Sequence, residues 1–234
     1  MTQPPITALP AATTLATRQG LGQRDRGDWA LEADQYLWTP TGQRYDRVSR
    51  VLSLWPSPEL AEWREQVGKA VANRTAKQTS RLGNLFDQAV GRLLQYEPIG
   101  KVPVEVGMGL RGFKDWHELN PFKPLAIQQT VWDDTLGIAG TPDCLADDEF
   151  FDWKLTGRIS MKHVLQLVFY WPMIEAVYGI TLRQARVVRF DRTLGIFQEK
   201  TVTPAIQANL YPLCGHLVKV YQGWRTLTEL QEVA

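Results

Sequence analysis

The residues best suited to hydrolytic chemistry are two aspartates and a lysine within residues 140–154. If Asp147 and Asp148 form a two-residue hairpin turn, counting outward from the turn places Asp143 opposite Asp152. Directly opposed side chains have Cβ atoms about 4.5 to 5.5 Å apart, so two carboxylates there repel each other unless a cation compensates them. Mg²⁺ prefers oxygen ligands and usually takes one or two carboxylates. The spacing therefore predicts a divalent-cation site across a hairpin.

The strand that carries the second aspartate has two different faces. Because successive side chains alternate, Asp152, Lys154 and Thr156 point to one side. The other side carries three side chains typical of a core: Phe151, Trp153 and Leu155. An Asp-x-Lys pair is common in exposed hairpins of any protein. Here the second carboxylate in register and the apolar opposite face favour a catalytic site, in which Lys154 reaches the scissile phosphate or the attacking water.

Residues 136–143 (LGIAGTPD) and 151–156 (FDWKLT) resemble the PD-(D/E)XK nuclease superfamily. The similarity is to its RecB-like exonuclease branch, which includes phage exonucleases and the mitochondrial genome maintenance exonuclease. The resemblance implies an α/β (α+β) fold with a restriction-endonuclease-like core, in which a central mixed β-sheet is flanked by helices. It also implies that Asp143, Asp152 and the backbone carbonyl of Trp153 hold Mg²⁺, for which Mn²⁺ can substitute, and that Lys154 orients the water and stabilises charge on the phosphate.

The family also places a Gln-x-x-x-Tyr pair on the following helix. Gln166 and Tyr170 match it and share one helical face, so the resemblance implies that they bind substrate, as we expect for Thr156. Two positions depart from the pattern. Asp87 occupies the place where relatives carry His, and Gln128 the place where many carry a metal-binding Glu. Both could be metal ligands, both could have packing roles, or the chain could be a degraded nuclease that only binds DNA.

Composition sets the class of protein. The chain has 234 residues, 44% of them hydrophobic, and a net charge of +1, so DNA contacts would need local clusters of basic residues. Two such clusters occur, and each could equally be a solvated face: Arg74, Lys77 and Arg81, and Arg183, Arg186, Arg189 and Arg192. No run of about 18 apolar residues and no signal pattern is present, so we expect no membrane partner and a cytoplasmic location in a bacterial or phage-infected cell.

Cys144 and Cys214 are expected to be core thiols.

The chain is expected to form a flexible arm over residues 1–27 and one nuclease domain over residues 28–234, with a helical part at about 57–96. An extended piece is predicted at 45–55 and a break with no regular structure at 100–112, followed by one or two helical turns at 114–119. The other predicted helices are 57–73, 78–95, 160–178 with a kink at Pro172, and one from Pro204. The predicted strands are 124–133, 137–146, 149–156, 184–190 and 195–202.

The predicted function is a Mg²⁺-dependent nuclease that hydrolyses DNA phosphodiesters, as an exonuclease on single-stranded DNA or DNA ends, in repair or recombination. The same core would also support an endonuclease on branched or duplex DNA. The departures at Asp87 and Gln128 keep a third reading open, a catalytically weakened DNA-binding or recombination scaffold. The sequence does not define the oligomeric state.

Overall fold

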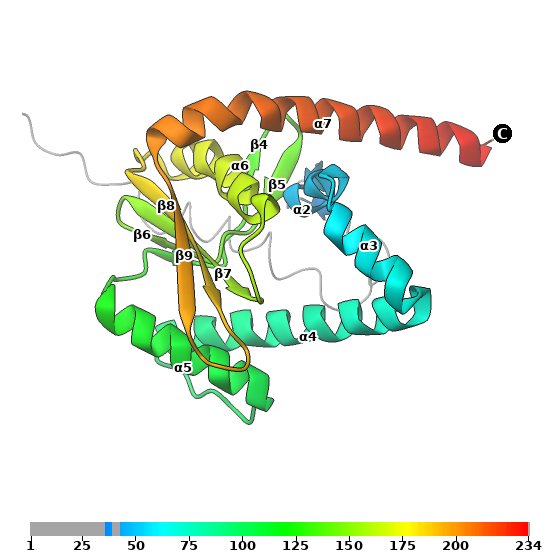
Figure 1. Ribbon diagram of the computed structural model, residues 1–234. Helices are drawn as coiled ribbons and strands as arrows, with labels where there is room; N and C mark the ends of the chain where they lie inside the picture. The colour runs from blue at the N-terminus through cyan, green and yellow to red at the C-terminus, as the bar shows by residue number, and fades with distance from the viewer. Residues whose placement is uncertain (1–35, 39–42, 234) are drawn as a thin grey trace, which may run out of the picture.

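The computed structural model describes residues 36–38 and 43–233 (Figure 1). The predicted flexible arm over residues 1–27 lies outside the described residues. The elements of the first half are β1 (Tyr36–Trp38), β2 (Arg44–Arg47), α2 (Val48–Val51), the 3-10 helix η1 (Leu52–Leu54), α3 (Pro58–Val67), α4 (Lys69–Leu94) and α5 (Val104–Leu119). The elements of the second half are β3 (Ala126–Ile127), β4 (Val131–Asp133), β5 (Ile138–Gly140), β6 (Cys144–Ala146), β7 (Glu149–Leu155), α6 (Met161–Tyr178), β8 (Gln184–Phe190), β9 (Phe197–Val202) and α7 (Pro204–Val233).

The centre of the molecule is a five-stranded sheet in the order β3-β6-β7-β8-β9. β7 and β8 run parallel and the other neighbours run antiparallel, so the sheet is mixed. Helices α6 and α7 lie on one side of it and α4 and α5 on the other (Figure 1). A smaller sheet with the order β1-β2-β5-β4 lies beside α6. The predicted fold class, a mixed sheet flanked by helices, is confirmed.

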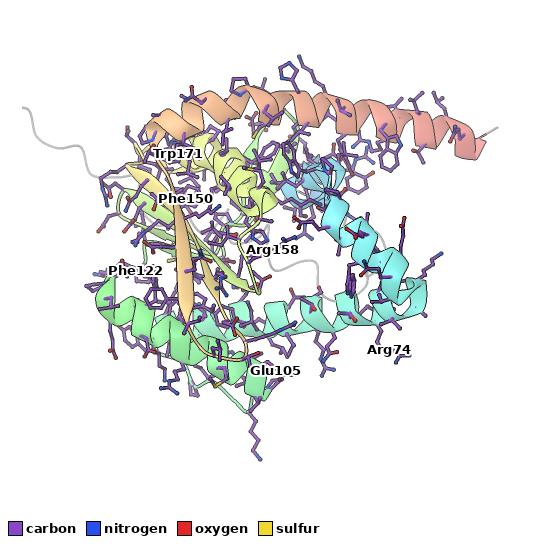
Figure 2. All side chains as sticks on the ribbon, in the orientation of Figure 1. Arg74, Glu105, Phe122, Phe150, Arg158 and Trp171 are labelled. Atoms are coloured by element: carbon purple, nitrogen blue, oxygen red, sulfur yellow. The ribbon has the colours of Figure 1, made fainter. Side chains whose placement is uncertain are left out.

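Strand β7 is covered on both faces, and this explains its sequence. Phe150 packs toward α6, where its ring meets Trp171 edge-on (Figure 2). On the other face, Phe151, Trp153 and Leu155 pack with α4 and α5 in an aromatic cluster that includes Trp116. The predicted apolar face of β7 is therefore confirmed.

The hairpin between β6 and β7 has the predicted register. Cys144 pairs with Phe151 and Ala146 with Glu149, so the turn consists of residues 147–148, and Asp147 adopts a φ of 47°. Two of the predicted strands, 124–133 and 137–146, are wrong in extent, because each is split into two short strands that belong to different sheets. The first split falls at Gln128, whose φ of 49° interrupts extended backbone, and the second at Pro142, which has no N–H to donate to a ladder.

The predicted break at 100–112 is also wrong, because helix α5 begins at Val104 and runs through three glycines. Two of those glycines allow close packing. A Cβ on Gly109 would lie 2.4 Å from a methyl carbon of Leu155, and one on Gly112 would lie 2.3 Å from the carbonyl oxygen of Gly195. The glycines therefore let α5 pack directly on the sheet and the β8–β9 turn, instead of ending the helix as their intrinsic propensity suggested.

The remaining elements differ from prediction mainly at their ends. The predicted extended piece at 45–55 is wrong beyond Arg47, because Val48, Val51 and Leu52 are buried in helical turns, at a spacing of three and four that also fits a helix. Gly68, with a φ of 78°, separates α3 from α4, so the second helix begins earlier than predicted. The predicted extents of α6 and β8 and the start of α7 are confirmed, α6 continues through Pro172, and β9 begins at Phe197.

Both cysteines are buried free thiols, as predicted. Among the described helices, none combines the length and the apolar character needed to cross a bilayer.

Candidate active site

The two predicted catalytic carboxylates lie at the open end of the β6–β7 hairpin. Asp152 belongs to β7 and is 1% exposed, and Asp143 directly precedes β6. The register of the hairpin, extended by one pair, places them opposite each other. Asp143 accepts a hydrogen bond through Oδ2 from the backbone N–H of Trp153, with 2.6 Å between the two atoms. This bond ties the Asp143 carboxylate to the partner strand.

Lys154 projects from the same face of β7 as Asp152 and forms an ion pair with its Oδ2. Its side chain is 23% exposed, so the ammonium group reaches the edge of the site. Burial lowers the pKa of Lys154, but the charges of Asp152, Asp143 and Asp87 outweigh this effect and raise that pKa above its ordinary value. The side chain therefore remains a cation at neutral pH.

Helix α4 contributes a third carboxylate, that of Asp87. Burial raises its pKa to about 7, with a lowering by Lys154 and a further raising by Asp152. Burial is also the main cause of the raised pKa values of Asp143 and Asp152. The three acids come from α4, the start of β6 and β7, and they are close enough for their charges to interact.

The carboxylates fit a divalent cation bound by two of them. Oδ2 of Asp152 is buried, and among the described residues the Lys154 ammonium is the one group that the structure places against it. The raised pKa values of Asp143 and Asp152 show that burying both negative charges is unfavourable, which a cation would relieve. Within the part of the chain that the structure describes, no three His, Cys, Asp or Glu side chains are grouped to enclose a metal. Mg²⁺ fits such an open site because it keeps several water ligands.

Gln128 connects the backbones that carry two of the acids. Its side-chain Nε2 donates to the carbonyl oxygen of Asp87 over 3.0 Å, and its own N–H donates to the carbonyl oxygen of Asp143 over 2.9 Å. The amide thus holds α4 against the start of β6. A glutamate at position 128 could not make this contact, because an ionised carboxylate has no proton to donate to the Asp87 carbonyl oxygen.

Gln166 and Tyr170 lie on α6, behind the carboxylates. Nε2 of Gln166 donates to the Tyr170 hydroxyl over 2.9 Å, and Tyr170 is 4% exposed. Burial, followed by the charge of Asp152, raises the pKa of Tyr170 to about 12. A Cβ on Gly140 would lie 2.3 Å from the Tyr170 ring, so the glycine of the Gly-Thr-Pro-Asp segment leaves room for this ring. Thr156, the third predicted substrate-binding residue, lies partly buried just after β7.

His163 is a polar group of the site to which the sequence analysis assigned no role. Its Nδ1 accepts the N–H of Ser160 over 3.2 Å in a capping box at the start of α6. Burial, with smaller effects from Lys154 and Lys162, lowers the pKa of His163 to about 4. The ring is therefore neutral and carries its proton on Nε2. The Ser-x-x-His spacing is a variant of the capping-box pattern and is the signal that could have indicated this role.

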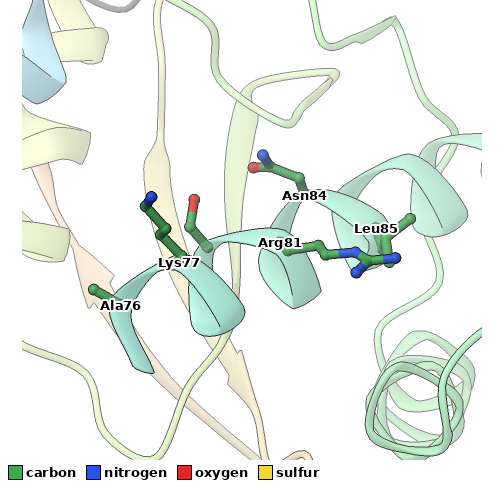
Figure 3. Close-up of a pocket in the computed structure, with 6 residues that line it drawn as sticks. Ala76, Lys77, Arg81, Asn84 and Leu85 are labelled. Carbon is green, nitrogen blue, oxygen red and sulfur yellow. The ribbon is translucent and has the colours of Figure 1, made fainter. Parts of the chain in front are cut away.

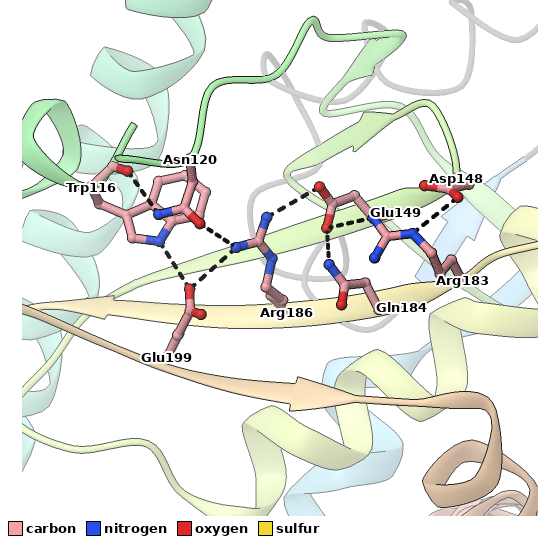
Figure 4. Close-up of polar contacts among 8 residues, drawn as sticks. All are labelled: Trp116, Asn120, Asp148, Glu149, Arg183, Gln184, Arg186 and Glu199. Carbon is pink, nitrogen blue, oxygen red and sulfur yellow. Dashed lines mark hydrogen bonds and ion pairs between the residues drawn. The ribbon is translucent and has the colours of Figure 1, made fainter. Parts of the chain in front are cut away.

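Three of the four arginines in the second predicted basic cluster form ion pairs within the protein, and Figure 4 shows those of Arg183 and Arg186. Arg183 pairs with Asp148 at 3.1 Å. Arg186, 8% exposed, pairs with Glu149 at 3.1 Å and Glu199 at 3.4 Å. Arg189 likewise pairs with Asp191 at 3.4 Å. The ion pairs of Arg186 join β8 to β7 and β9, and the exposed Arg192 takes no part in these contacts. The first predicted cluster lies exposed on α4, the helix that carries Asp87.

Similarity to known proteins is found among solved structures. No family model and no curated protein matches the sequence. One neighbour is LHK-Exo, in a crystal structure of its complex with dAMP. It is 12% identical to this chain with a TM-score of 0.39, and the match covers 81% of this chain and 95% of the LHK-Exo chain. An alkaline exonuclease (LHK-Exo) from Laribacter hongkongensis is 11% identical over the same shares with a TM-score of 0.38. A putative exonuclease from Eubacterium rectale is 9% identical with a TM-score of 0.43, and covers 76% of this chain and 82% of its own. Structural neighbours of this chain are thus exonucleases. Structural similarity at this level does not assign an activity, so any proposed activity depends on the side chains of the site.

Proposed function

We propose that this protein is a Mg²⁺-dependent deoxyribonuclease that hydrolyses phosphodiester bonds in single-stranded DNA or at DNA ends. The observation that carries the proposal is the pairing of β6 with β7, which sets Asp143 opposite Asp152 and places Lys154 on the same face. The buried Asp152, the partly buried Asp143 and one cation in this arrangement match the requirements of phosphoryl chemistry, which needs metal ligands beside a fixed positive charge.

In the proposed mechanism, Asp143 and Asp152 hold the cation, and Asp87 adds negative charge beside them. The chemistry that Mg²⁺ supplies when bound is polarisation of the phosphate and activation of water. Lys154, fixed by its ion pair with Asp152, stabilises the negative charge that develops on the phosphate oxygens. The water oxygen bonds to phosphorus while one P–O bond to the sugar breaks, and a water proton passes to the sugar oxygen that leaves. One product therefore ends in a phosphate and the other in a hydroxyl group.

Gln166 and Tyr170 have a positioning role in this proposal. Tyr170 is almost completely buried next to Gly140, three residues before Asp143, and its hydroxyl is held by Gln166. The pair supports the backbone that leads into the site. Gln128 supports the same backbone from the side of α4.

The test is a cleavage assay on end-labelled single-stranded DNA, end-labelled duplex DNA and closed circular DNA, each with Mg²⁺, Mn²⁺ or EDTA. We expect the labelled strands to be shortened with either metal, the circles to remain whole, and EDTA to stop all cleavage. Cut circles would instead indicate an endonuclease. If every substrate is bound but stays whole, the protein is a scaffold and the catalytic proposal is wrong.

Two variants connect the activity to the site. Asp152→Asn and Lys154→Ala should each lower cleavage by at least about 10²-fold, the usual effect of removing one electrostatic group from a transition state. Matched controls come from the same sheet: Asp147→Asn in the exposed hairpin turn, where Asn tolerates the positive φ, and Lys200→Ala on the exposed face of β9. Wild-type rates in either site variant would remove the basis of the assignment.

A further inference from the structure

Helix α4 has two faces, and its polar face carries an excess of positive charge. Its buried face packs into the core through Leu82, Phe86, Ala89 and Val90. Between Lys69 and Leu94 the helix contains several lysines and arginines but a single acid, Asp87. We define the α4 polar face by five exposed residues, of which Arg74, Lys77, Arg81 and Asn84 follow one another at spacings of three or four and Ser80 adjoins Arg81.

Four of these residues line a shallow hollow on the surface of α4: Lys77, Ser80, Arg81 and Asn84. Lys77 and Asn84 project from the same side of the helix, and Arg81 extends along it (Figure 3). Arg74 continues the row toward the start of α4 (Figure 2). The hollow is therefore bordered by two cationic side chains, one hydroxyl group and one amide, which are donors that commonly contact phosphate oxygens.

The charges on this face are not neutralised by neighbouring acids. Within residues 36–38 and 43–233, Arg74, Lys77 and Arg81 have no ion-pair partner, whereas Arg183 and Arg186 of the other predicted cluster are both paired. A cation paired inside the protein must break that pair before it binds a phosphate. The unpaired cations of α4 have no such cost and are free to bind a polyanion.

The α4 polar face leads directly to the candidate active site. Asn84 lies one helical turn before Asp87, whose carboxylate interacts with the charges of Asp152 and Lys154. At a rise of about 1.5 Å per residue, the distance along the helix from Arg74 to Asp87 is about 20 Å. The face is therefore long enough for several successive phosphates of one strand to lie along it.

We propose that the α4 polar face binds the sugar-phosphate backbone of the DNA strand and guides it to the carboxylates. This inference rests on the proposed nuclease function and adds the path of the substrate. Because the donors on this face suit phosphates rather than base edges, the binding is independent of sequence and depends strongly on salt.

The test measures binding without cleavage. A fluorescently labelled single-stranded oligonucleotide is titrated with the full-length protein in EDTA, and fluorescence anisotropy gives the dissociation constant over a series of salt concentrations. Each phosphate contact with single-stranded DNA contributes about 0.7 to the slope of log K against log salt. The triple variant Arg74→Ala, Lys77→Ala and Arg81→Ala should therefore lower the magnitude of the slope by about 2, and each single variant by about 0.7.

The matched control removes three exposed positive charges elsewhere: Lys101→Ala, Lys114→Ala and Lys200→Ala. It changes net charge equally but should leave the slope unchanged. An equal fall of the slope in this control, an unchanged slope in the α4 variants, or no binding by the wild type would each overturn the inference. If the triple variant does not fold, the single variants decide.

The two proposals fail separately. If the wild-type protein cleaves DNA but the α4 variants keep the wild-type salt slope, the proposed DNA path along α4 is wrong and the nuclease proposal stands. If the wild-type protein binds DNA with the expected salt slope but cleaves it with no metal, the nuclease proposal is wrong and the α4 polar face remains a DNA-binding surface.

Discussion

Replacing Asp87 by asparagine should make the metal-free protein more stable above neutral pH. Burial raises the pKa of Asp87 to about 7 in the folded protein, against an ordinary value of 3.8. Between these two pH values the folded state holds a proton that the unfolded state has lost, so its stability falls as the pH rises. The difference of about three pH units corresponds to about 4 kcal/mol, and the full cost is present above pH 7.

Asparagine has a similar shape but no charge, so the variant avoids this cost. Its partly buried amide needs hydrogen-bond partners, which we take to cost about 1 kcal/mol, and the net gain at pH 8 is then about 3 kcal/mol. For a chain of this length such a gain raises Tm by roughly 6 to 12 °C. At pH 4, where the wild-type carboxyl is protonated when folded, the variant should have no advantage.

The assay is thermal unfolding of both proteins at pH 4 and pH 8 in EDTA, followed by circular dichroism. Asp147→Asn, in the exposed turn of the same chain, serves as the control and should give the wild-type Tm at both pH values. Adding Mg²⁺ at pH 8 should narrow the gap between wild type and Asp87→Asn, because the cation offsets the same repulsion. An asparagine variant that is no more stable than wild type at pH 8, or equally stabilised at both pH values, would refute the electrostatic reasoning.

Three further substitutions separate packing from chemistry. Gly140→Ala places a Cβ 2.3 Å from the Tyr170 ring and should lower the free energy of unfolding by about 1 to 3 kcal/mol together with kcat, as denaturant titration and the cleavage assay would show. Gly112→Ala meets the carbonyl of Gly195 at 2.3 Å and should cost a similar free energy while kcat per folded molecule stays at the wild-type value. Arg186→Leu leaves the carboxylates of Glu149 and Glu199 without their shared partner and should cost about 3 to 5 kcal/mol, with no change in the salt slope of DNA binding.

The candidate site was more predictable than parts of the fold that surrounds it. The turn at Asp147 and Asp148 and strict strand alternation defined the register, and these local rules are sufficient to place Asp143 opposite Asp152. Helix α5 could not be predicted in the same way. Its glycines suggested a break between elements. In the structure Gly109 and Gly112 allow close contact with Leu155 and Gly195, which are distant in sequence.

The contacts that support the catalytic side chains also could not be predicted from one sequence. Gln128 appears in the sequence as the loss of a carboxylate, whereas in the structure its amide donates to the backbone of Asp87, on another element. The burial of Tyr170 depends on α6 packing against Gly140. The ion pairs of Arg183 and Arg186 likewise depend on which strands become neighbours. In each case the deciding partner is supplied by tertiary structure.

Strand β7 has polar chemistry on one side and aromatic packing on the other, both within a covered sheet. A slip of one residue in its pairing would drive Asp152 and Lys154 among the rings and turn Phe151 and Trp153 toward the carboxylates. The native register is thus strongly favoured over a register shifted by one residue. If the proposed cleavage activity is found, specific activity should therefore rise in proportion to the fraction of correctly folded molecules and can be used to follow refolding yield.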